Sequence, residues 1–160
     1  MGEGRRLTLR PIGRVVEGYP RQGGADVREE GSAEIEIDVA WAEALDGIDG
    51  FSHIWVVWWP DRFEEPPTSP RVHPEGREEM PLVGLFATRS PHRPCPIAIT
   101  AVRLLERRGT RLRVQGLDAS LGTPIFDIKP YLRRGDLIPE ATMPDWLEHL
   151  WRIHDEERGL

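Results

Sequence analysis

The sequence predicts an all-β fold, a small barrel or sandwich that carries a long Pro-rich loop and one C-terminal amphipathic helix. Many short apolar segments are separated by turns rich in Gly and Pro, and they do not alternate with helical patterns as βαβ units do. One of these segments alternates strictly between apolar and acidic residues. A single pattern of helical period lies near the end of the chain.

The first two predicted strands flank a polar, Gly-rich loop at residues 19–31. Ala33–Val39 alternates apolar with acidic side chains, as expected of a strand with one buried and one solvent-exposed face. Leu7–Val16 also reads as a strand, and Pro11 and Gly13 within it indicate an edge position or a bulge.

The third predicted strand follows a short helical segment. Trp41–Leu45 allows a turn or two of helix before Gly47 and Gly50 stop it. Phe51–Trp59 is apolar on both alternating faces apart from His53, which predicts a strand buried on two sides near the centre of the core.

The second half of the predicted sheet follows a charged excursion at residues 60–81, whose six prolines are typical of a functional or mobile loop. Leu82–Phe86 is a short apolar strand. Ile97–Glu106 and Arg111–Leu117 form a hairpin across a turn that contains Gly109.

Residues 143–154 carry apolar side chains at helical spacing, which predicts an amphipathic helix that packs on the barrel or on a partner. Thr142 is the predicted N-cap, with Asp145 three residues later. We expect residues 1–135 to form the barrel domain and residues 136–160 to form a helical extension of that same domain.

The net charge of −6, from 21 basic and 27 acidic residues, argues against a non-specific nucleic-acid binder. Any such role needs a local patch. Arginines cluster on the predicted hairpin and could form a basic stripe. The favoured interpretation is that they lie on a solvent-exposed rim of the hairpin. They are Arg103, Arg107, Arg108, Arg111 and Arg113.

Cys95 is the only cysteine, so the chain cannot form an internal disulfide, which fits a reducing cytosol. No apolar run reaches the length of a membrane span, and the first ten residues lack a signal-peptide apolar region. We therefore expect a cytoplasmic protein without membrane association. Without CxxC or HxxxH spacing, no metal site is expected.

The stretch Gly84–Ile99, GLFATRSPHRPCPIAI, ends a strand abruptly in arginines, a histidine and three prolines. Prolines fix the backbone, and here they would hold Arg89, His92 and Arg93 in set positions as preorganised cations. The alternative is a rigid loop whose arginines reach solvent.

The stretch Leu117–Tyr131, LDASLGTPIFDIKPY, surrounds a Gly-Thr-Pro turn with acids and a lysine. Gly122 allows close approach of a ligand to the backbone, while Asp118 and Asp127 can bind polar groups or exchange protons. The alternative is a β-turn with surface charges.

Five blocks together resemble the TrmO (TsaA-like) family of tRNA threonylcarbamoyladenosine methyltransferases. They are PIGRV at 11–15, YPRQ at 19–22, GFSHIWVV at 50–57, GLFATRSPHRPCPI and LGTPIFDIKPYL. The likeness runs from Pro11 to Leu132. It implies a small β barrel, a homodimer, and bound S-adenosylmethionine without the Rossmann motif GxGxxG, which this sequence lacks.

The resemblance also implies which residues contact the cofactor, with the positions at 61 and 62 assigned only by their offset from the FSHIW block. Arginine suits the carboxylate of S-adenosylmethionine, apolar and backbone groups suit the adenine, and acidic or carbonyl oxygens suit the sulfonium. The positions are Pro20, Arg21, Gln22, Asp61, Arg62, Arg89, Ile99, Leu121, Gly122, Thr123 and Pro124.

Methyl transfer from an activated donor mainly requires alignment of the acceptor. An exocyclic adenine nitrogen must also lose a proton, so a base helps, and Asp118 and Asp127 are the candidates. Tyr131 or Lys129 would polarise the carbonyl of the acceptor. The alternative is a local ion pair between Asp127 and Lys129, with Tyr131 in the core.

Three tryptophans, Trp55, Trp58 and Trp59, are predicted to fill the core or a dimer interface rather than to stack on bases.

Two positions depart from the family pattern: Cys95 replaces an asparagine, and Leu121 replaces an acid. After residue 132 we expect only a linker and one helix, without the further C-terminal domain of longer relatives.

These departures and the acidic charge leave three functions open. The first is methylation of threonylcarbamoyladenosine in tRNA. The second is methylation of a different, small-molecule acceptor by the same barrel. The third is a regulatory module that binds S-adenosylmethionine without turnover.

Overall fold

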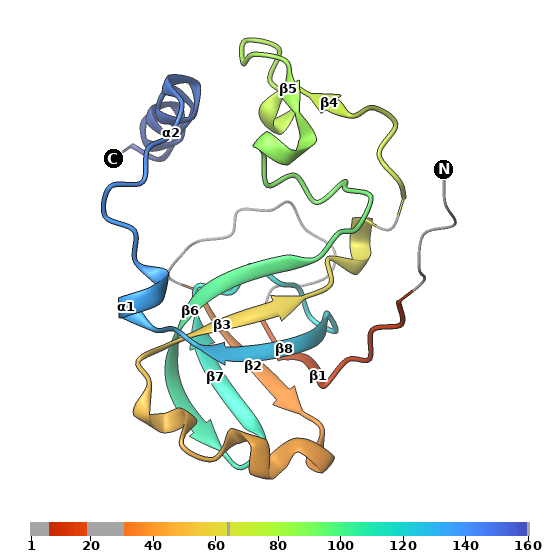
Figure 1. Ribbon diagram of the computed structural model, residues 1–160, viewed down its shortest axis with the longest axis vertical. Helices are drawn as coiled ribbons and strands as arrows, with labels where there is room; N and C mark the ends of the chain where they lie inside the picture. The colour runs from red at the N-terminus through yellow and green to blue at the C-terminus, as the bar shows by residue number, and fades with distance from the viewer. Residues whose placement is uncertain (1–6, 19–30, 64, 160) are drawn as a thin grey trace. The chain divides into compact units, whose positions relative to one another are not determined.

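The computed structural model describes residues 7–18, 31–63 and 65–159. Six antiparallel strands close into a barrel in the order β1-β2-β7-β6-β3-β8 (Figure 1). This confirms the barrel rather than the sandwich. The strands are β1 (Gly13–Glu17), β2 (Ser32–Ile37), β3 (His53–Trp58), β6 (Ala98–Arg108), β7 (Arg111–Gln115) and β8 (Pro124–Pro130).

The interior of the barrel is filled by side chains that alternate along the strands. In β2, Ala33, Ile35 and Ile37 are buried, which confirms the period-two prediction. The strand ends before Val39, which is exposed and instead begins a 3₁₀ helix over Val39–Leu45. The predicted helical turn is therefore present, but it begins two residues earlier than expected. Gly47 follows it with a φ of 84°.

β3 is buried on one face and half-buried on the other. Ile54, Val56 and Trp58 point into the core, whereas Trp55 and Val57 are only partly covered. The prediction of burial on two sides was wrong, because β3 is one strand of a closed barrel, so one of its faces lines the interior and the other belongs to the outer wall. Its pairing with both β6 and β8 does place it centrally.

β1 starts later than predicted and is not an edge strand, since it pairs with both β2 and β8. The register shifts between Val15 and Glu17, so the expected irregularity is a bulge. Gly13 lies very close to the neighbouring backbone: a Cβ there would be 2.2 Å from the carbonyl oxygen of Glu36.

The predicted hairpin forms, with Gly109 at a φ of 60° in the turn. β6 starts one residue and ends two residues later than expected, and β7 ends two residues earlier. Two of its arginines are exposed and form ion pairs, whereas Arg107 is mostly covered and donates to the carbonyls of Leu45 and Gly109. Arg111 lies 2.8 Å from Glu34 and 3.2 Å from Glu36, and the hydrogen bond to Glu34 raises the pKa of the guanidinium. Arg108 pairs with Glu106 at 2.8 Å, which supports the interpretation as a hairpin rim.

β8 was not predicted as a strand. Residues 117–131 read as a turn followed by charges, and a proline stands at each end of the strand. Only Ile125 is fully buried in it, so the apolar alternation that reveals β2 is weak here.

A second compact unit combines residues 65–95 with 133–159, whereas the barrel unit comprises residues up to 64 and 96–132. Within the Pro-rich excursion, β4 (Arg71–Val72) pairs with β5 (Val83–Gly84), which follows the excursion, in a two-stranded sheet. The strand predicted at Leu82–Phe86 is shorter, because Leu85 begins a 3₁₀ helix. With these short helices the fold is mostly rather than entirely β.

Two α-helices complete the second unit, α1 (Arg133–Asp136) and α2 (Asp145–Arg158). Pro144 occupies the N-cap of α2, so the prediction of Thr142 was wrong. The residue before a proline is driven out of the helical region, which prevents the helix from starting earlier. Asp145 instead places its charge in the first turn, where the helix dipole favours it.

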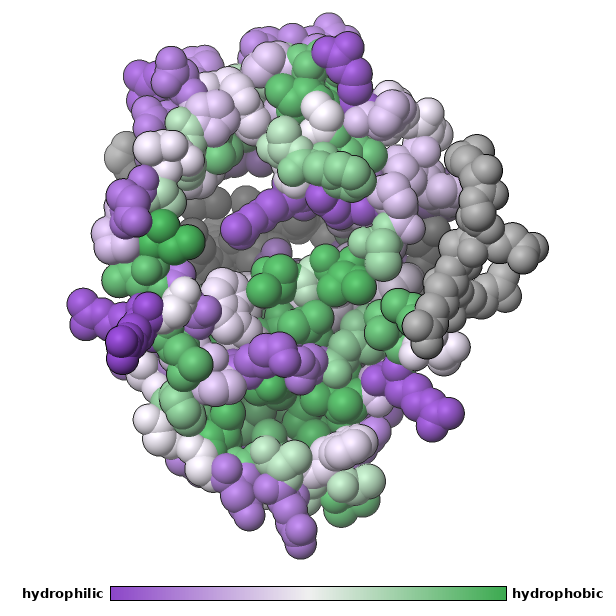
Figure 2. Space-filling model, in the orientation of Figure 1, coloured by the Kyte–Doolittle hydropathy of each residue, from purple (hydrophilic) through white to green (hydrophobic). Residues whose placement is uncertain are grey.

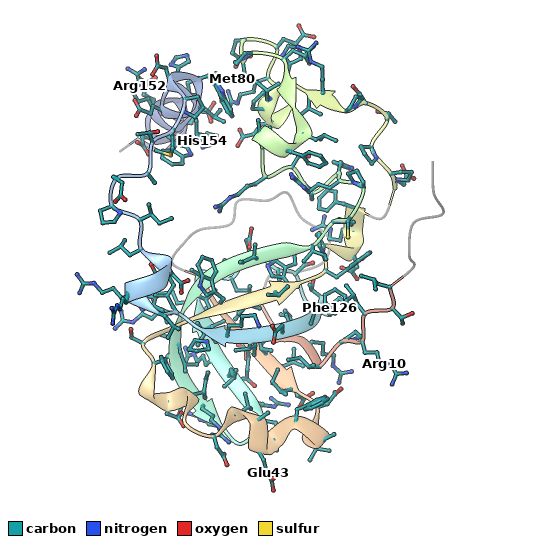
Figure 3. All side chains as sticks on the ribbon, viewed as in Figure 1. Arg10, Glu43, Met80, Phe126, Arg152 and His154 are labelled. Atoms are coloured by element: carbon teal, nitrogen blue, oxygen red, sulfur yellow. The ribbon has the colours of Figure 1, made fainter. Side chains whose placement is uncertain are left out.

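α2 is joined to the segment around residues 74–80 by charged side chains. Arg77 donates two hydrogen bonds to Glu157, at 2.8 and 3.0 Å, and these raise its pKa. His154, labelled in Figure 3, lies 2.8 Å from Glu75, whose φ of 57° is left-handed. Met80, labelled in the same view, is buried.

Within the described ranges, none of the helices has the length and apolar character needed to cross a membrane.

The close approach at Gly13 predicts that Gly13→Ala destabilises the barrel. The new methyl group would collide with the backbone at Glu36, so we expect a loss of about 1–3 kcal/mol in the free energy of unfolding, measured by urea denaturation. Gly50→Ala is the control, because no atom lies within 4 Å of a Cβ at that position, and its change should stay within about 1 kcal/mol. Equal stability of the two variants would contradict the prediction.

Candidate functional site

The Gly-Thr-Pro turn (residues 121–124) leads into β8 and is tied to β1 by backbone hydrogen bonds. Gly122, at a φ of 86°, donates its N–H to the carbonyl of Val15 at 2.8 Å. The carbonyl of Thr123 accepts from the N–H of Val15 at 3.0 Å. The barrel thus fixes the shape of this turn, and only glycine accepts the left-handed backbone there without strain.

Residues of this turn differ in their exposure to solvent. Thr123 is 2% exposed, and its hydroxyl lies 3.4 Å from that of Ser120. Leu121, by contrast, is 45% exposed. Thr123 therefore supports the turn from inside, while Leu121 is presented to solvent.

A chain of polar groups runs from the core to the surface through Thr100, a residue for which the sequence predicted no role, and links Trp58 to Asp118. The indole N–H of Trp58 donates to Thr100 Oγ1 at 3.0 Å, and Thr100 Oγ1 donates to Asp118 Oδ1 at 3.0 Å. Trp58 is buried, as predicted, while Asp118 is exposed. The one local signal for Thr100 is a hydroxyl within the otherwise apolar run at residues 97–102.

The other predicted acid, Asp127, lies on the outer wall of the barrel. It stands opposite Val57 on β3, which in turn stands opposite Ile99 on β6. Its Oδ2 is 2.7 Å from Lys129 Nζ, and its Oδ1 accepts the backbone N–H of Ile128 at 2.9 Å. The ion-pair alternative is present, and both oxygens of Asp127 are engaged.

Aromatic side chains cover part of the same outer wall. Tyr131 is half-buried, with its ring 5.6 Å from that of Trp55, so it is not a core residue. Phe126, labelled in Figure 3, meets Trp59 edge to face at 5.9 Å. Figure 2 shows hydrophobic side chains, broken by hydrophilic ones, on the face of the barrel formed by β3 and β8.

The Arg-Pro turn (residues 88–96) belongs, up to Cys95, to the second unit. Arg93 donates to the carbonyls of Thr88 at 2.8 Å, Leu85 at 3.2 Å and Ser90 at 3.4 Å, and lies 5.4 Å from the ring centroid of Phe86. Arg93 therefore rigidifies the turn. Arg89 is exposed and has no side-chain hydrogen bond or ion pair with another described residue, which leaves its guanidinium available.

An apolar pocket of about 440 Å³ lies beside this turn in the second unit, a volume within the range of small-molecule sites. Its wall includes the exposed ring of Phe86 and the buried side chain of Leu85. Prolines complete the wall and limit its flexibility; they are Pro67, Pro70 and Pro94.

The remaining predicted cofactor positions divide between described and undescribed parts of the chain. Pro20, Arg21 and Gln22 lie outside the described residues. Asp61 and Arg62 form a 3₁₀ helix with Phe63 directly after β3, and the N–H of Asp61 donates to the carbonyl of Trp59 at 2.8 Å.

Each unit carries groups whose chemistry suits part of S-adenosylmethionine. The barrel unit offers an exposed carboxylate at Asp118 and a backbone turn with Gly122, which suit a sulfonium and hydroxyl groups. The second unit offers an unengaged arginine, Arg89, and an apolar pocket, which suit a carboxylate and a purine ring. Across the described ranges, no three potential metal ligands gather at one place.

Comparison with known proteins agrees with this chemistry. Residues 14–137 match the tRNA-methyltransferase O N-terminal domain family. A probable S-adenosyl-L-methionine-binding protein of Methanothermobacter thermautotrophicus is 39% identical over 128 residues, which cover 78% of this chain and 90% of that protein. The tRNA (adenine(37)-N6)-methyltransferase of Escherichia coli is 34% identical over 127 residues, or 77% of this chain and 54% of that protein.

Other relatives are longer than the matched region. A probable S-adenosyl-L-methionine-binding protein of Archaeoglobus fulgidus is 38% identical over 154 residues, and the match covers 89% of this chain but 38% of that protein. The crystal structure of TrmO from Pseudomonas aeruginosa superposes with a TM-score of 0.68 at 29% identity, covering 88% of this chain and 62% of that one. From the barrel, its Gly-Thr-Pro turn and the match over residues 14–137, we conclude that the chain belongs to the TrmO N-terminal domain family.

Proposed function

We propose that this protein is an S-adenosylmethionine-dependent methyltransferase that N-methylates threonylcarbamoyladenosine next to the anticodon of tRNA. The observation that carries the proposal is the family match over residues 14–137, which includes both the Arg-Pro turn and the Gly-Thr-Pro turn. A relative that shares 34% identity with this chain is a tRNA (adenine(37)-N6)-methyltransferase.

In this proposal each turn has a distinct binding role. Arg89 clamps the carboxylate of the cofactor, because an arginine without another partner can offer two parallel N–H donors. The turn at 121–124 presents its backbone and the side chain of Leu121 to the ligand. Ile99, Asp61, Arg62 and residues 20–22 complete the contacts that the family resemblance implies. When bound, S-adenosylmethionine supplies an activated methyl group, so the protein mainly has to align the acceptor.

Of the two candidate bases, the structure favours Asp118. Asp127 is held by Lys129 and by a backbone N–H, so its negative charge is already compensated. Asp118 is exposed and is oriented by a neutral hydroxyl. In the proposed reaction Asp118 takes the proton of the acceptor nitrogen, and Lys129 or Tyr131 polarises the carbonyl of the threonylcarbamoyl group. The homodimer stays a prediction.

A second candidate is methylation of a small-molecule acceptor. Two observations favour it: the net charge of −6 is unlike that of most proteins that bind the phosphate backbone, and several relatives are named only for S-adenosylmethionine. Binding without turnover is the third possibility, and the experiment below separates all three.

Incubation of the purified protein with methyl-labelled S-adenosylmethionine and bulk tRNA should label the nucleic acid. Nucleoside analysis is expected to show a methylated threonylcarbamoyladenosine, and tRNA from cells that cannot make this modified base should remain unlabelled. Cofactor binding with transfer only to a small acceptor would support the second candidate. Tight binding with no transfer to any acceptor would support the regulatory module.

Arg89→Ala should weaken cofactor binding without affecting the fold. Loss of a charge-assisted hydrogen bond costs about 1.5–3 kcal/mol, so we expect Kd for S-adenosylmethionine to rise about 10- to 100-fold in calorimetry. Arg152→Ala, which removes another exposed arginine of the second unit from α2, is the matched control and should leave Kd unchanged (Figure 3). If both variants bind like the wild type, Arg89 does not hold the cofactor.

A further inference from the structure

We infer that Thr100 is a positioning residue for methyl transfer, which fixes the Asp118 carboxylate through a hydrogen-bond chain that begins at Trp58. The inference rests on the proposed function for the role of Asp118, but its geometric part stands on the barrel unit alone. The two hydrogen bonds of the chain are both 3.0 Å long.

The direction of the chain follows from the chemistry of its donors. An indole N–H can only donate, so Thr100 Oγ1 must act as the acceptor toward Trp58. A threonine hydroxyl has a single proton, and that proton is then directed at Asp118 Oδ1. The carboxylate form of Asp118 therefore meets a donor whose orientation is already set by the core.

Each member of the chain is anchored by the barrel. Trp58 is 8% exposed and points inward from β3. Thr100 stands opposite the buried Val56 in the β3–β6 ladder. Asp118 lies between Leu117 and Ala119, which are both 0% exposed, so its backbone is held while its side chain reaches solvent.

An exposed carboxylate with a fixed backbone and one hydrogen bond from the protein has few orientations open to it. Free rotation of an aspartate side chain would spread its oxygens over several positions, whereas a general base must meet its proton within hydrogen-bond distance. The acceptor nitrogen would take the methyl group from the sulfonium sulfur, which would keep the electron pair of the broken S–C bond as a neutral thioether, and the nitrogen would lose its proton while keeping the N–H electron pair. Asp118 takes that proton, and Thr100 can continue to donate to Oδ1 throughout.

The first test compares Thr100→Val with Thr100→Ser. Valine keeps the shape but removes the hydroxyl, so kcat for tRNA methylation should fall about 10- to 100-fold, with KM for tRNA and Kd for S-adenosylmethionine within about threefold of wild type. Serine retains the hydroxyl and should restore kcat to within a few-fold. Thr110→Val, in the β6–β7 turn, is the control and should leave kcat unchanged.

A second measurement is independent of turnover. The indole N–H resonance of Trp58, assigned with Trp58→Phe in nitrogen-15 spectra, should move in Thr100→Val because its acceptor is lost, and should stay near its wild-type position in Thr100→Ser. If Thr100→Val does not fold, Trp58→Phe takes its place in the kinetic test, since it removes the donor that orients Thr100.

The outcomes distinguish the inference from the function on which it rests. Full kcat in Thr100→Val, equal losses in the serine and valine variants, or an unmoved Trp58 resonance would each overturn the positioning role. In Asp118→Asn, which should lower kcat about 10²- to 10⁴-fold, a further Thr100→Val change should have little additional effect. If the wild-type protein transfers no methyl group to tRNA, the proposed function fails, whereas the resonance of Trp58 still reports whether the chain exists.

Discussion

The seam between β1 and β8 is the constraint on which both the barrel and the candidate site depend. The two strands are in register at only two pairs, Gly13 with Ile125 and Arg14 with Pro124. Further backbone hydrogen bonds extend the seam on both sides. The N–H of Ile12 donates to the carbonyl of Ile125, and Val15 both donates to the carbonyl of Thr123 and accepts from the N–H of Gly122. The same contacts that close the barrel therefore shape the Gly-Thr-Pro turn. A ligand at this turn meets a backbone that strand pairing has already ordered, which reduces the entropy lost on binding.

The parts of the fold that could be predicted from the sequence are those with a strong local signal. β2 was evident from the alternation of Ala33, Ile35 and Ile37 with acids, and the β6–β7 hairpin from two apolar runs around Gly109. β8 was not predicted because Asp127 and Lys129 interrupt its apolar pattern and a proline stands at each of its ends. The start of α2 was misplaced because Thr142 resembles a cap, while the backbone restriction imposed by Pro144 decides where the helix begins.

The candidate site shows a similar division. Residue types indicated the two turns, but not which side chains remain available for a ligand. Arg93 and Arg89 look alike in the sequence, yet three backbone carbonyls engage only Arg93. Asp118 and Asp127 also look alike, and the partners that distinguish them come from hydrogen bonds formed in the folded chain. Thr100 and Trp58 are 42 residues apart, so no local pattern could have joined them.

The attachment of α2 within the second unit has a different physical character from the barrel. Its polar contacts to the segment around residues 74–80 run through partly exposed side chains, whereas the barrel interior is mostly aliphatic; they are Arg77, Glu157, Glu75 and His154. Exposed ion pairs weaken as salt is added, since the screening length falls from about 10 Å at 0.1 M to about 3 Å at 1 M, whereas buried hydrocarbon is scarcely affected. Concentrated electrolyte therefore weakens the ionic part of the hold on α2, while the buried Leu150 of that helix and the aliphatic interior of the closed sheet keep their contribution.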